Sequence, residues 1–343
     1  MTTRLLSFSE ISSALTCTMR HDLAYVGHAA GSALKSRSVG RRLTEGRAFG
    51  AAVATWHQRR DELFTTFDAH QALVASLTED FDQMAAAGAF VSVDELVAAQ
   101  TRVGAVLDDY IARATPMALT RLEDPLDMPL RSRGGKRGSS RYRFTGRIDG
   151  FAPDEYGHRW IVEFKLRGQL TPAWLIAIQP QTRYYGLALA HEWGQAPVGV
   201  IVEERLNEAP HAARILKSGK PSTDRQQMTT GALYRAACAE TGADVDEELA
   251  ATYDARQWQQ RVPILFRPGE LDEAANELVG AARLIQALDT GEIPPIRNVN
   301  RFNCSGCQFR EICASPRDGA FVDALFERVP AKRDREVTTR EAA

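Results

Sequence analysis

The sequence predicts one α/β domain, with a mixed central β-sheet flanked by helices. Three observations predict it: a β-hairpin near the middle of the chain, segments of helical periodicity on both sides of it, and a group of cysteines near the C-terminus. The chain has 343 residues, 44% of them hydrophobic, so it can bury a substantial core. No apolar run approaches the ~18 residues of a membrane span, and the N-terminus lacks a signal-peptide core, so we expect a cytoplasmic protein.

The predicted hairpin runs from Arg141 to Leu166 around the turn PDEYGH at residues 153–158. Both flanks are rich in aromatic and β-branched residues, which favour strands. Successive side chains of a strand point to opposite faces, so each strand has one apolar and one polar face. The apolar faces carry Phe144, Ile148 and Ala152 in the first strand and Trp160, Val162, Phe164 and Leu166 in the second.

The polar faces bring charged residues together. A turn centred at Tyr156 pairs residues whose numbers sum to twice 156, which places Asp149 opposite Glu163 and Arg147 opposite Lys165. Directly opposed like charges destabilise a hairpin by roughly 0.2 to 1 kcal/mol, so the two carboxylates require a compensating cation. Mg²⁺ and Mn²⁺ prefer oxygen ligands, and a nearby lysine can orient or help deprotonate a water and offset charge on a phosphate. A phosphodiesterase site and an ordinary solvated polar face both fit these residues alone.

A helical segment follows the hairpin. Thr171 and Pro172 predict a helix start, with a capping hydroxyl and a proline at the first helical position. Pro180 predicts a bend or a division of this helix. Gln181 and Tyr185 are four residues apart and therefore share one helical face.

The order of these motifs resembles the PD-(D/E)XK nuclease superfamily and, within it, the RecB-like exonucleases. The motifs are Gly-x-x-Asp ending at Asp149, Glu-x-Lys ending at Lys165, and Gln-x-x-x-Tyr ending at Tyr185. The resemblance implies a restriction-endonuclease-like core. It also implies that Asp149, Glu163 and the backbone carbonyl of Phe164 bind Mg²⁺ or Mn²⁺, and that Lys165 serves the attacking water. Gln181 and Tyr185 would then contact the nucleic acid or support the site.

Five cysteines point to a second site: Cys17, Cys238, Cys304, Cys307 and Cys313. An odd count without a secretory leader argues against a disulfide framework and for a metal site in a reducing compartment. The last three form a C-x2-C-x5-C run, for which Cys17 is the candidate fourth ligand, whereas Cys238 has the apolar context of a buried thiol. Four thiolates suit structural Zn²⁺ or an iron-sulfur cluster.

This cysteine arrangement resembles the AddB nuclease domain and the CRISPR-associated RecB-like exonucleases, which implies a 4Fe-4S cluster and a C-terminal iron-sulfur cap. The resemblance spans about Leu5 to Cys313. One departure is Gly50, which stands where the family commonly has a metal-binding His. His57, seven residues later, is a candidate substitute; the alternative is a solvated helix residue.

Two basic stretches are candidate phosphate contacts, although solvated loops remain an alternative for both. The formal net charge is −2, so nucleic-acid binding requires local patches of this kind. One stretch runs from Lys35 to Arg47 and precedes Gly50. The other runs from Arg131 to Arg143 and is expected to form a basic hairpin tip beside the acidic site. The DNA-binding candidates are the basic residues of this stretch together with Arg147 of the following strand: Arg131, Arg133, Lys136, Arg137, Arg141, Arg143 and Arg147.

The domain organisation is predicted as one nuclease unit over residues 1–315, followed by a charged, frayed tail over 316–343. Residues 51–115 are helical in pattern, and Ser92 with Glu95 forms a capping box. Residues 205–260 are expected to be an insertion, in which Lys217, Lys220 and Arg225 either bind DNA or lie on a surface excursion; residues 300–315 form the cysteine cap.

The expected function is a metal-dependent exonuclease that acts on single-stranded or frayed DNA ends in recombination, repair or phage DNA processing. No nucleotide-hydrolysis motif is present, so the chain is not expected to be a helicase by itself. DNA is the expected substrate, and a helicase, a recombinase or a CRISPR integrase is a candidate partner. Two alternatives remain open: a non-catalytic iron-sulfur DNA-binding or adaptor module on the same fold, and a CRISPR spacer-acquisition nuclease.

Overall fold

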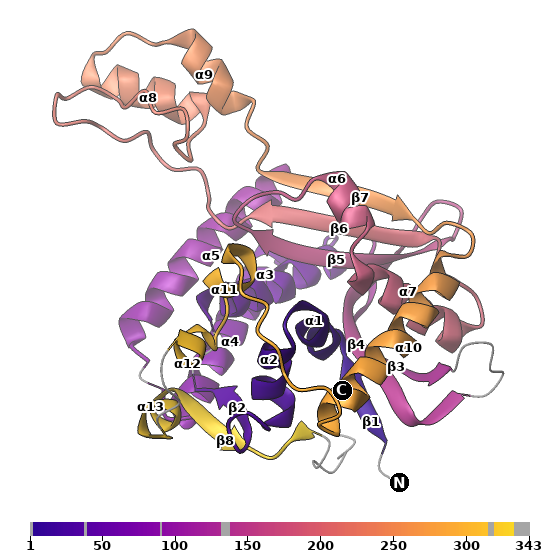
Figure 1. Ribbon diagram of the computed structural model, residues 1–343. Coiled ribbons are helices and arrows are strands. Elements are labelled where there is room, and N and C mark those ends of the chain that lie inside the picture. The colour runs from indigo at the N-terminus through magenta and orange to yellow at the C-terminus, as the bar shows by residue number, and fades with distance from the viewer. Residues whose placement is uncertain (1–2, 38–39, 90, 132–137, 315–318, 333–343) are drawn as a thin grey trace.

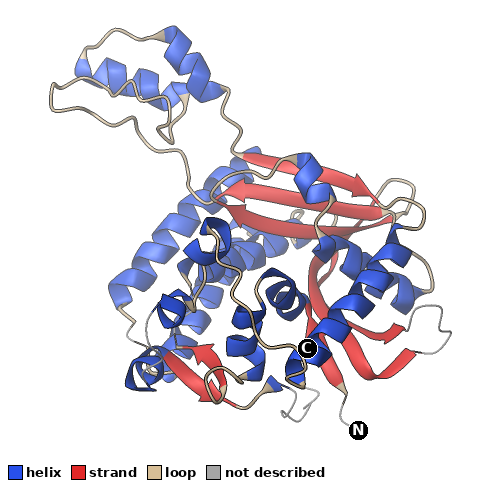
Figure 2. Ribbon diagram, in the orientation of Figure 1, coloured by secondary structure: helices blue, strands red, loops and turns tan. Residues whose placement is uncertain are grey.

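A six-stranded mixed β-sheet lies between two layers of helices (Figures 1 and 2). The protein is represented by a computed structural model that describes residues 3–37, 40–89, 91–131, 138–314 and 319–332. This architecture confirms the predicted sheet flanked by helices. The strands of the sheet are β1 (Arg4–Ser7), β3 (Thr120–Arg131), β4 (Gly138–Pro153), β5 (Arg159–Arg167), β6 (Gly199–Leu206) and β7 (Gln259–Leu265).

The strand order is β1-β4-β5-β6-β7, with β3 also paired to β4. The pairs β1–β4 and β5–β6 are parallel, and the other pairs of this sheet are antiparallel. Between β4 and β5 the register runs from Gly150 opposite Val162 to Pro153 opposite Arg159. These pairs have the number sum predicted from a turn centred at Tyr156, so the predicted hairpin register is confirmed over these residues.

Each face of the sheet packs against its own group of helices. Ile161 and Phe144 contribute to the core on one face, and Val162 and Phe164 contribute to the core on the other. The described residues include no helix that is both long enough and apolar enough to cross a membrane. The first face is covered by α1 (Phe8–Thr16), α6 (Ala173–Ala177), α7 (Pro180–Trp193) and α10 (Glu270–Asp289), and the second by α3 (Arg41–Gln58), α4 (Thr65–Ala86) and α5 (Val93–Arg113).

Local signals in the sequence set several helix ends. The predicted division at Pro180 is confirmed, since α6 ends at Ala177 and Pro180 opens α7. Ser92 and Glu95 form the predicted capping box of α5. The predicted cap at Thr171 is wrong: Pro172 occupies the N-cap position of α6, and the Thr171 hydroxyl donates to the Glu204 carboxylate instead.

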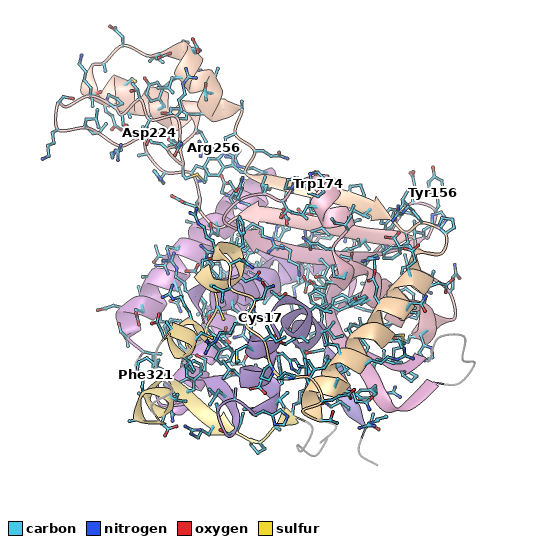
Figure 3. The ribbon with its side chains drawn as sticks, in the orientation of Figure 1. Cys17, Tyr156, Trp174, Asp224, Arg256 and Phe321 are labelled. Atoms are coloured by element: carbon cyan, nitrogen blue, oxygen red, sulfur yellow. The ribbon has the colours of Figure 1, made fainter. Side chains whose placement is uncertain are left out.

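Residues between β6 and β7 form a small projecting unit, here called the arm. It contains α8 (Gly231–Thr241) and α9 (Glu247–Asp254), and Figure 1 shows it extending away from the sheet. Tyr234, Cys238 and Tyr253 belong to its separate hydrophobic core. Figure 3 labels Asp224 and Arg256 in the arm. Lys217, Lys220 and Arg225 all lie on it, exposed to solvent.

Segments from both ends of the chain form a second small unit, here called the cysteine lobe. A two-stranded antiparallel sheet joins β2 to β8, and an apolar core includes Leu23, Phe309 and Phe326. The elements of the lobe are α2 (Thr18–His21), the π-helical turn η1 (Asp22–Val26), β2 (Ala33–Ser36), α11 (Arg301–Ser305), α12 (Arg310–Ala314), α13 (Gly319–Leu325) and β8 (Phe326–Val329).

The predicted frayed tail after residue 315 is wrong for residues 319–332. Phe326 stacks on Phe309 with ring centroids 5.3 Å apart, and Lys332 Nζ lies 2.6 Å from Glu10 Oε2. Val322 is buried beside them. The charged composition of the segment concealed these apolar anchors, whose partners lie far away in the sequence. Residues 316–318 and 333–343 lie outside the described residues.

Candidate active site

Strand β4 changes neighbours where the predicted acidic residue lies. Its pairs with β1 end at Thr145, and its pairs with β5 begin at Gly150. Residues 146–149 lie between these two registers, and part of this stretch pairs with β3 on the opposite edge of β4. The sheet therefore opens at Asp149, the residue that the sequence places in the site.

The predicted site residues meet at this opening. Asp149 lies beyond the last registered pair, and its Oδ2 accepts a hydrogen bond from the Phe164 backbone N–H at 2.7 Å. Lys165 Nζ lies 2.6 Å from Glu163 Oε2. Glu163 is only 1% exposed, whereas the Lys165 side chain is 24% exposed. The opening therefore brings together the buried Glu163 carboxylate, the Asp149 carboxylate and the more accessible Lys165 ammonium group.

Burial and mutual charge shift the pKa values of these groups. Burial raises the pKa of Asp149, and the Lys165 ammonium and the Phe164 N–H offset only part of that rise. Burial works to lower the pKa of Lys165, but the carboxylates of Glu163 and Asp149 outweigh it and hold that pKa above its usual range. Lys165 is therefore protonated at neutral pH, as a group that stabilises negative charge must be.

Helix α7 closes the site from one side. Gln181 Nε2 donates to the Tyr185 hydroxyl at 3.1 Å, so the two residues interact as their spacing predicts. Burial, together with the charge of Glu163, raises the pKa of Tyr185 to about 12. The Tyr185 ring packs against Gly146 of β4, where a Cβ atom would lie 2.7 Å from Tyr185 Cε1.

Gly146→Ala is expected to displace the Tyr185 ring, because the added methyl group has no room. We expect a loss of roughly 1 to 3 kcal/mol in the free energy of unfolding, measured by urea denaturation. Gly50→Ala is the matched control: its Cβ meets no atom within 4 Å, so replacing a mid-helix glycine should stabilise α3 by roughly 0.5 to 1 kcal/mol. Equal stability of Gly146→Ala and the parent protein would contradict this packing.

A cleft of about 720 Å³ leads to the opening in the sheet. Asp149 and Lys165 lie at its base, and α3 and α4 form its walls. The sequence motifs pointed to none of the α4 residues, because only tertiary packing brings that helix to the site. Gly50 lines the cleft, and open space lies over it. The wall residues are Arg42, Leu43, Gly46, Arg47, Gly50 and Ala51 of α3 and Ala75, Ser76, Glu79, Asp80 and Gln83 of α4.

The environment of His57 matches neither of the two alternatives, a metal ligand or a solvated helix residue. His57 is fully buried, so it is not a solvated helix residue. Its Nδ1 accepts the Met117 backbone N–H at 3.0 Å, and its Nε2 lies 2.8 Å from the Tyr110 hydroxyl. Because protein groups engage both ring nitrogens, we do not retain His57 as a metal ligand. Its ring stacks on Phe164 and thereby supports the backbone that carries the Asp149 contact.

The stability of the protein is expected to depend on pH through His57. Burial, reinforced by the charges of Arg261 and Arg60, lowers the pKa of His57 to about 3. Between about pH 6.5 and pH 3 the His57 imidazole is therefore protonated in the unfolded chain but neutral in the folded chain. The free energy of unfolding falls as the pH falls through this window. We expect this residue to contribute up to about 1.4 kcal/mol per pH unit. Urea denaturation of the parent protein and of His57→Gln across this range should give a shallower slope for the variant; equal slopes would contradict the assignment.

The predicted basic residues divide into three groups. Arg147 lines the cleft, together with Arg42 and Arg47 from the other basic stretch. Arg143 instead pairs with Asp127 at 2.6 Å, and Arg141 lies over the Tyr142 ring. The third group lies outside the described residues or has undescribed side chains: Arg131, Arg133, Lys136 and Arg137.

The predicted position of the hairpin tip beside the acidic site stays a prediction, because residues 132–137 lie outside the described residues and the structure places only the part of the stretch that lies on β4. Arg141 precedes Asp149 by eight residues of that strand. Eight residues of extended strand span roughly 26 Å. Among the described residues, the cations that line the cleft are Arg42 and Arg47 from α3, Arg147 from β4 and Lys165 from β5.

Comparison with known proteins decides the family. A model of the PD-(D/E)XK nuclease superfamily matches residues 5–314. The chain belongs to the PD-(D/E)XK nuclease superfamily. No curated protein sequence matches it with significance. Among solved structures, the crystal structure of SSO0001 is similar over 77% of this chain and 84% of its own, at 12% identity and a TM-score of 0.30, which is too low to support any argument.

PD-(D/E)XK nucleases generally use divalent metals such as Mg²⁺ or Mn²⁺. The donor set at the opening fits such an ion, because Asp149 and Glu163 supply carboxylate oxygens and Phe164 supplies a backbone carbonyl on the same strand. The described residues contain no group of three or more His, Cys, Asp or Glu side chains placed to hold a metal ion. Two carboxylates are nevertheless a typical protein contribution to a Mg²⁺ site.

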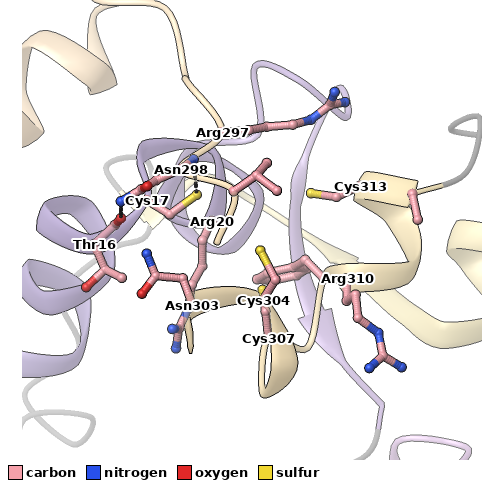
Figure 4. Close-up of a pocket in the computed structure, with 13 residues that line it drawn as sticks. Thr16, Cys17, Arg20, Arg297, Asn298, Asn303, Cys304, Cys307, Arg310 and Cys313 are labelled. Carbon is pink, nitrogen blue, oxygen red and sulfur yellow. Dashed lines mark hydrogen bonds between the residues drawn. The ribbon is translucent and has the colours of Figure 1, made fainter. Parts of the chain in front are cut away.

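Four of the five cysteines line one cavity of about 280 Å³ in the cysteine lobe (Figure 4). Figure 4 shows the sulfur atoms of Cys17, Cys304, Cys307 and Cys313 around one space. Cys17 Sγ also accepts the Asn298 backbone N–H at 3.5 Å. The structure therefore brings together the cysteines that the sequence singled out, whereas Cys238 is buried in the arm.

Proposed function

We propose that this PD-(D/E)XK nuclease is a Mg²⁺- or Mn²⁺-dependent exonuclease that hydrolyses phosphodiester bonds of single-stranded or frayed DNA ends. One observation carries the proposal: Asp149, Glu163 and Lys165 meet where the sheet opens into a cleft. The family membership supports the nuclease chemistry, since it places all three residues within the matched segment.

Each residue is assigned a role from its position. Asp149, Glu163 and the carbonyl of Phe164 would hold the cation, which supplies a Lewis acid beside the scissile phosphate. The protonated Lys165 orients the attacking water and offsets charge on the phosphate while the bond from phosphorus to the leaving oxygen breaks. Tyr185, fixed by Gln181, positions the strand from α7.

The cleft supports a single strand as the substrate. Its volume of about 720 Å³ is within the range of pockets that enclose a small ligand, and therefore suits a few nucleotides better than a duplex. Arg42, Arg47 and Arg147 along its walls are assigned to the phosphates. Glycines at positions 46 and 50 leave room for a backbone to pass close to α3.

Digestion of end-labelled DNA tests the proposal. The substrates are single- and double-stranded molecules, linear and circular, each incubated with Mg²⁺ or Mn²⁺. We expect degradation of linear single strands from an end, with circular single strands spared. Cleavage of circles would instead identify an endonuclease, and no cleavage of any substrate with either metal would reject the assignment.

We also propose that Cys17, Cys304, Cys307 and Cys313 hold a 4Fe-4S cluster with a structural role. All-thiolate ligation suits a cluster or Zn²⁺. The four thiols share one cavity, and the resemblance of their spacing to the iron-sulfur nucleases is the reason for preferring the cluster. A cluster would bind each thiolate to a different iron, and it would tie residue 17 to residue 313.

A second candidate function is a non-catalytic DNA-binding or adaptor module. Gly50 favours it, because that position lines the cleft and contributes no side chain to the cation site. Retention of single-stranded DNA without turnover in Mg²⁺ or Mn²⁺ would distinguish this module from a nuclease.

A further inference from the structure

The segment from Ile296 to Phe302 exposes three large apolar side chains on the cysteine lobe. Ile296 is 64% exposed, Val299 is 76% exposed and Phe302 is 90% exposed. A single exposed apolar residue requires no explanation, but three within seven residues form a patch of the kind that marks an interaction site.

Hydrogen bonds hold this segment against the start of the lobe. The Ile296 carbonyl accepts the Met19 backbone N–H at 3.0 Å, and the Ile296 N–H donates to the Thr18 hydroxyl at 2.7 Å. Asn298 Nδ2 donates to the Thr16 carbonyl at 2.8 Å. The backbone beneath the apolar side chains is therefore anchored at several points, so little ordering entropy is lost when a ligand binds.

Arginines lie within this segment and in the adjoining cavity. Residues 293–310 contain three arginines and no acidic residue. Arg20 and Arg297 line the cysteine cavity that borders the segment, and Arg301 precedes Phe302. Within the described part of the chain, no carboxylate lies within ion-pair distance of Arg20, Arg297 or Arg301, although many other arginines have one.

We propose that Phe302, with Arg20, Arg297 and Arg301, forms a second binding site for single-stranded nucleic acid, outside the catalytic cleft. An exposed aromatic ring beside unpaired cations matches the two requirements of such a ligand, a surface for base stacking and partners for phosphates. The identity of the ligand rests on the proposed nuclease function. A strand held at both places is retained more strongly than by either place alone.

The chemistry of the patch favours nucleic acid over an acidic protein segment. Base stacking requires the flat face of an aromatic ring, whereas a protein side chain can pack equally well on leucine. Phe302→Trp should therefore preserve binding and Phe302→Leu should not. If Phe302→Leu binds as tightly as the parent protein, stacking is excluded and the proposal fails.

The test measures binding of fluorescein-labelled oligothymidylate by fluorescence anisotropy. It uses the full chain carrying Lys165→Ala, so that binding is read without cleavage. Phe302→Ala in this background is expected to bind about 5- to 100-fold more weakly. Phe67→Ala is the matched control, since Phe67 is also an exposed phenylalanine but lies on α4. Unchanged affinity of Phe302→Ala would overturn the proposal.

The arginines are tested through the dependence of affinity on salt. Each phosphate contact that is lost should reduce the slope of log K against log salt by about 0.7 for a single strand. We therefore expect a shallower slope for the double variant Arg20→Ala/Arg297→Ala. An unchanged slope together with a loss of visible absorbance would show that these arginines support the cysteine site, and it would overturn their proposed role in binding phosphates.

Failure of this inference is distinguishable from failure of the proposed function. A parent protein that cleaves DNA, combined with unchanged oligonucleotide affinity in Phe302→Ala, rejects the second site alone. A parent protein that never cleaves, combined with weakened binding in Phe302→Ala, rejects the nuclease activity and leaves the binding surface in place.

Discussion

Lys165→Ala is expected to lower the rate of single-stranded DNA cleavage by at least about 10²- to 10³-fold. Lys165 is the more accessible member of a pair with the buried Glu163, and its pKa is held above the usual range, so it carries a positive charge at the base of the cleft. The measurement is the initial rate of release of labelled nucleotides in Mn²⁺.

Arg167→Ala is the matched control for this prediction. Arg167 follows on the same face of β5, two residues after Lys165, and pairs with Glu204. Glu204 also accepts hydrogen bonds from Thr171 and Gln260, so it retains partners in the variant. We expect Arg167→Ala to keep most of the activity.

Loss of stability must be separated from loss of chemistry. Removing Lys165 leaves the buried Glu163 without its ammonium partner, which destabilises a folded protein. Circular dichroism therefore accompanies the assay, and Glu163→Gln/Lys165→Gln provides a second variant in which the charges of Glu163 and Lys165 are removed together. Undiminished cleavage by folded Lys165→Ala would show that the active site lies elsewhere.

Cys307→Ala is expected to remove the visible absorbance of the protein. If the four thiols hold a 4Fe-4S cluster, the parent protein should be brown, with broad absorbance near ~400 nm. The variant should be colourless and should unfold at a lower temperature, because Cys307 lies beside the core formed by Phe309 and Ile312. Absorbance spectra, iron content and thermal unfolding of proteins purified without oxygen measure these effects.

Cys238→Ala is the control for the cysteine prediction. Cys238 is as buried as a core residue, but it lies in the separate core of the arm. We expect this variant to retain both colour and iron. A colourless parent protein with stoichiometric zinc would reject the cluster and leave the four cysteines as a structural zinc site.

The hairpin was predictable because its determinants are local. A turn of known centre and strands of alternating polarity specify the register between β4 and β5, and a proline specifies the division before α7. These signals predict that Asp149, Glu163 and Lys165 share one face of the hairpin and that Gln181 and Tyr185 share one face of the helix. The resemblance to the nuclease superfamily, and not any local signal, assigned the two groups to one site.

The surroundings of the site were not predictable in this way. Helical periodicity showed that His57 lies on a helix but not that Met117 and Tyr110 enclose it, because those partners come from distant segments. The same reason applies to Asp80, which reaches the cleft only because α4 packs on α3. The opening at Asp149 arises from a change of neighbour along β4, which alternation of polarity within one strand cannot reveal.

The pairing of β2 with β8 also has a consequence for biosynthesis. Ala33 lies opposite Val329, and 329 − 33 gives a separation of 296 residues. At about 5 to 20 residues per second, a ribosome needs roughly 15 to 60 s to translate that interval. During this time β2 has left the ribosome's active site, but β8, with which it pairs, has not yet been translated. Contacts of such high sequence separation also form slowly. The cysteine lobe is therefore the last part of the protein to be completed, and chaperones that shield nascent chains have the longest opportunity to act on its N-terminal half.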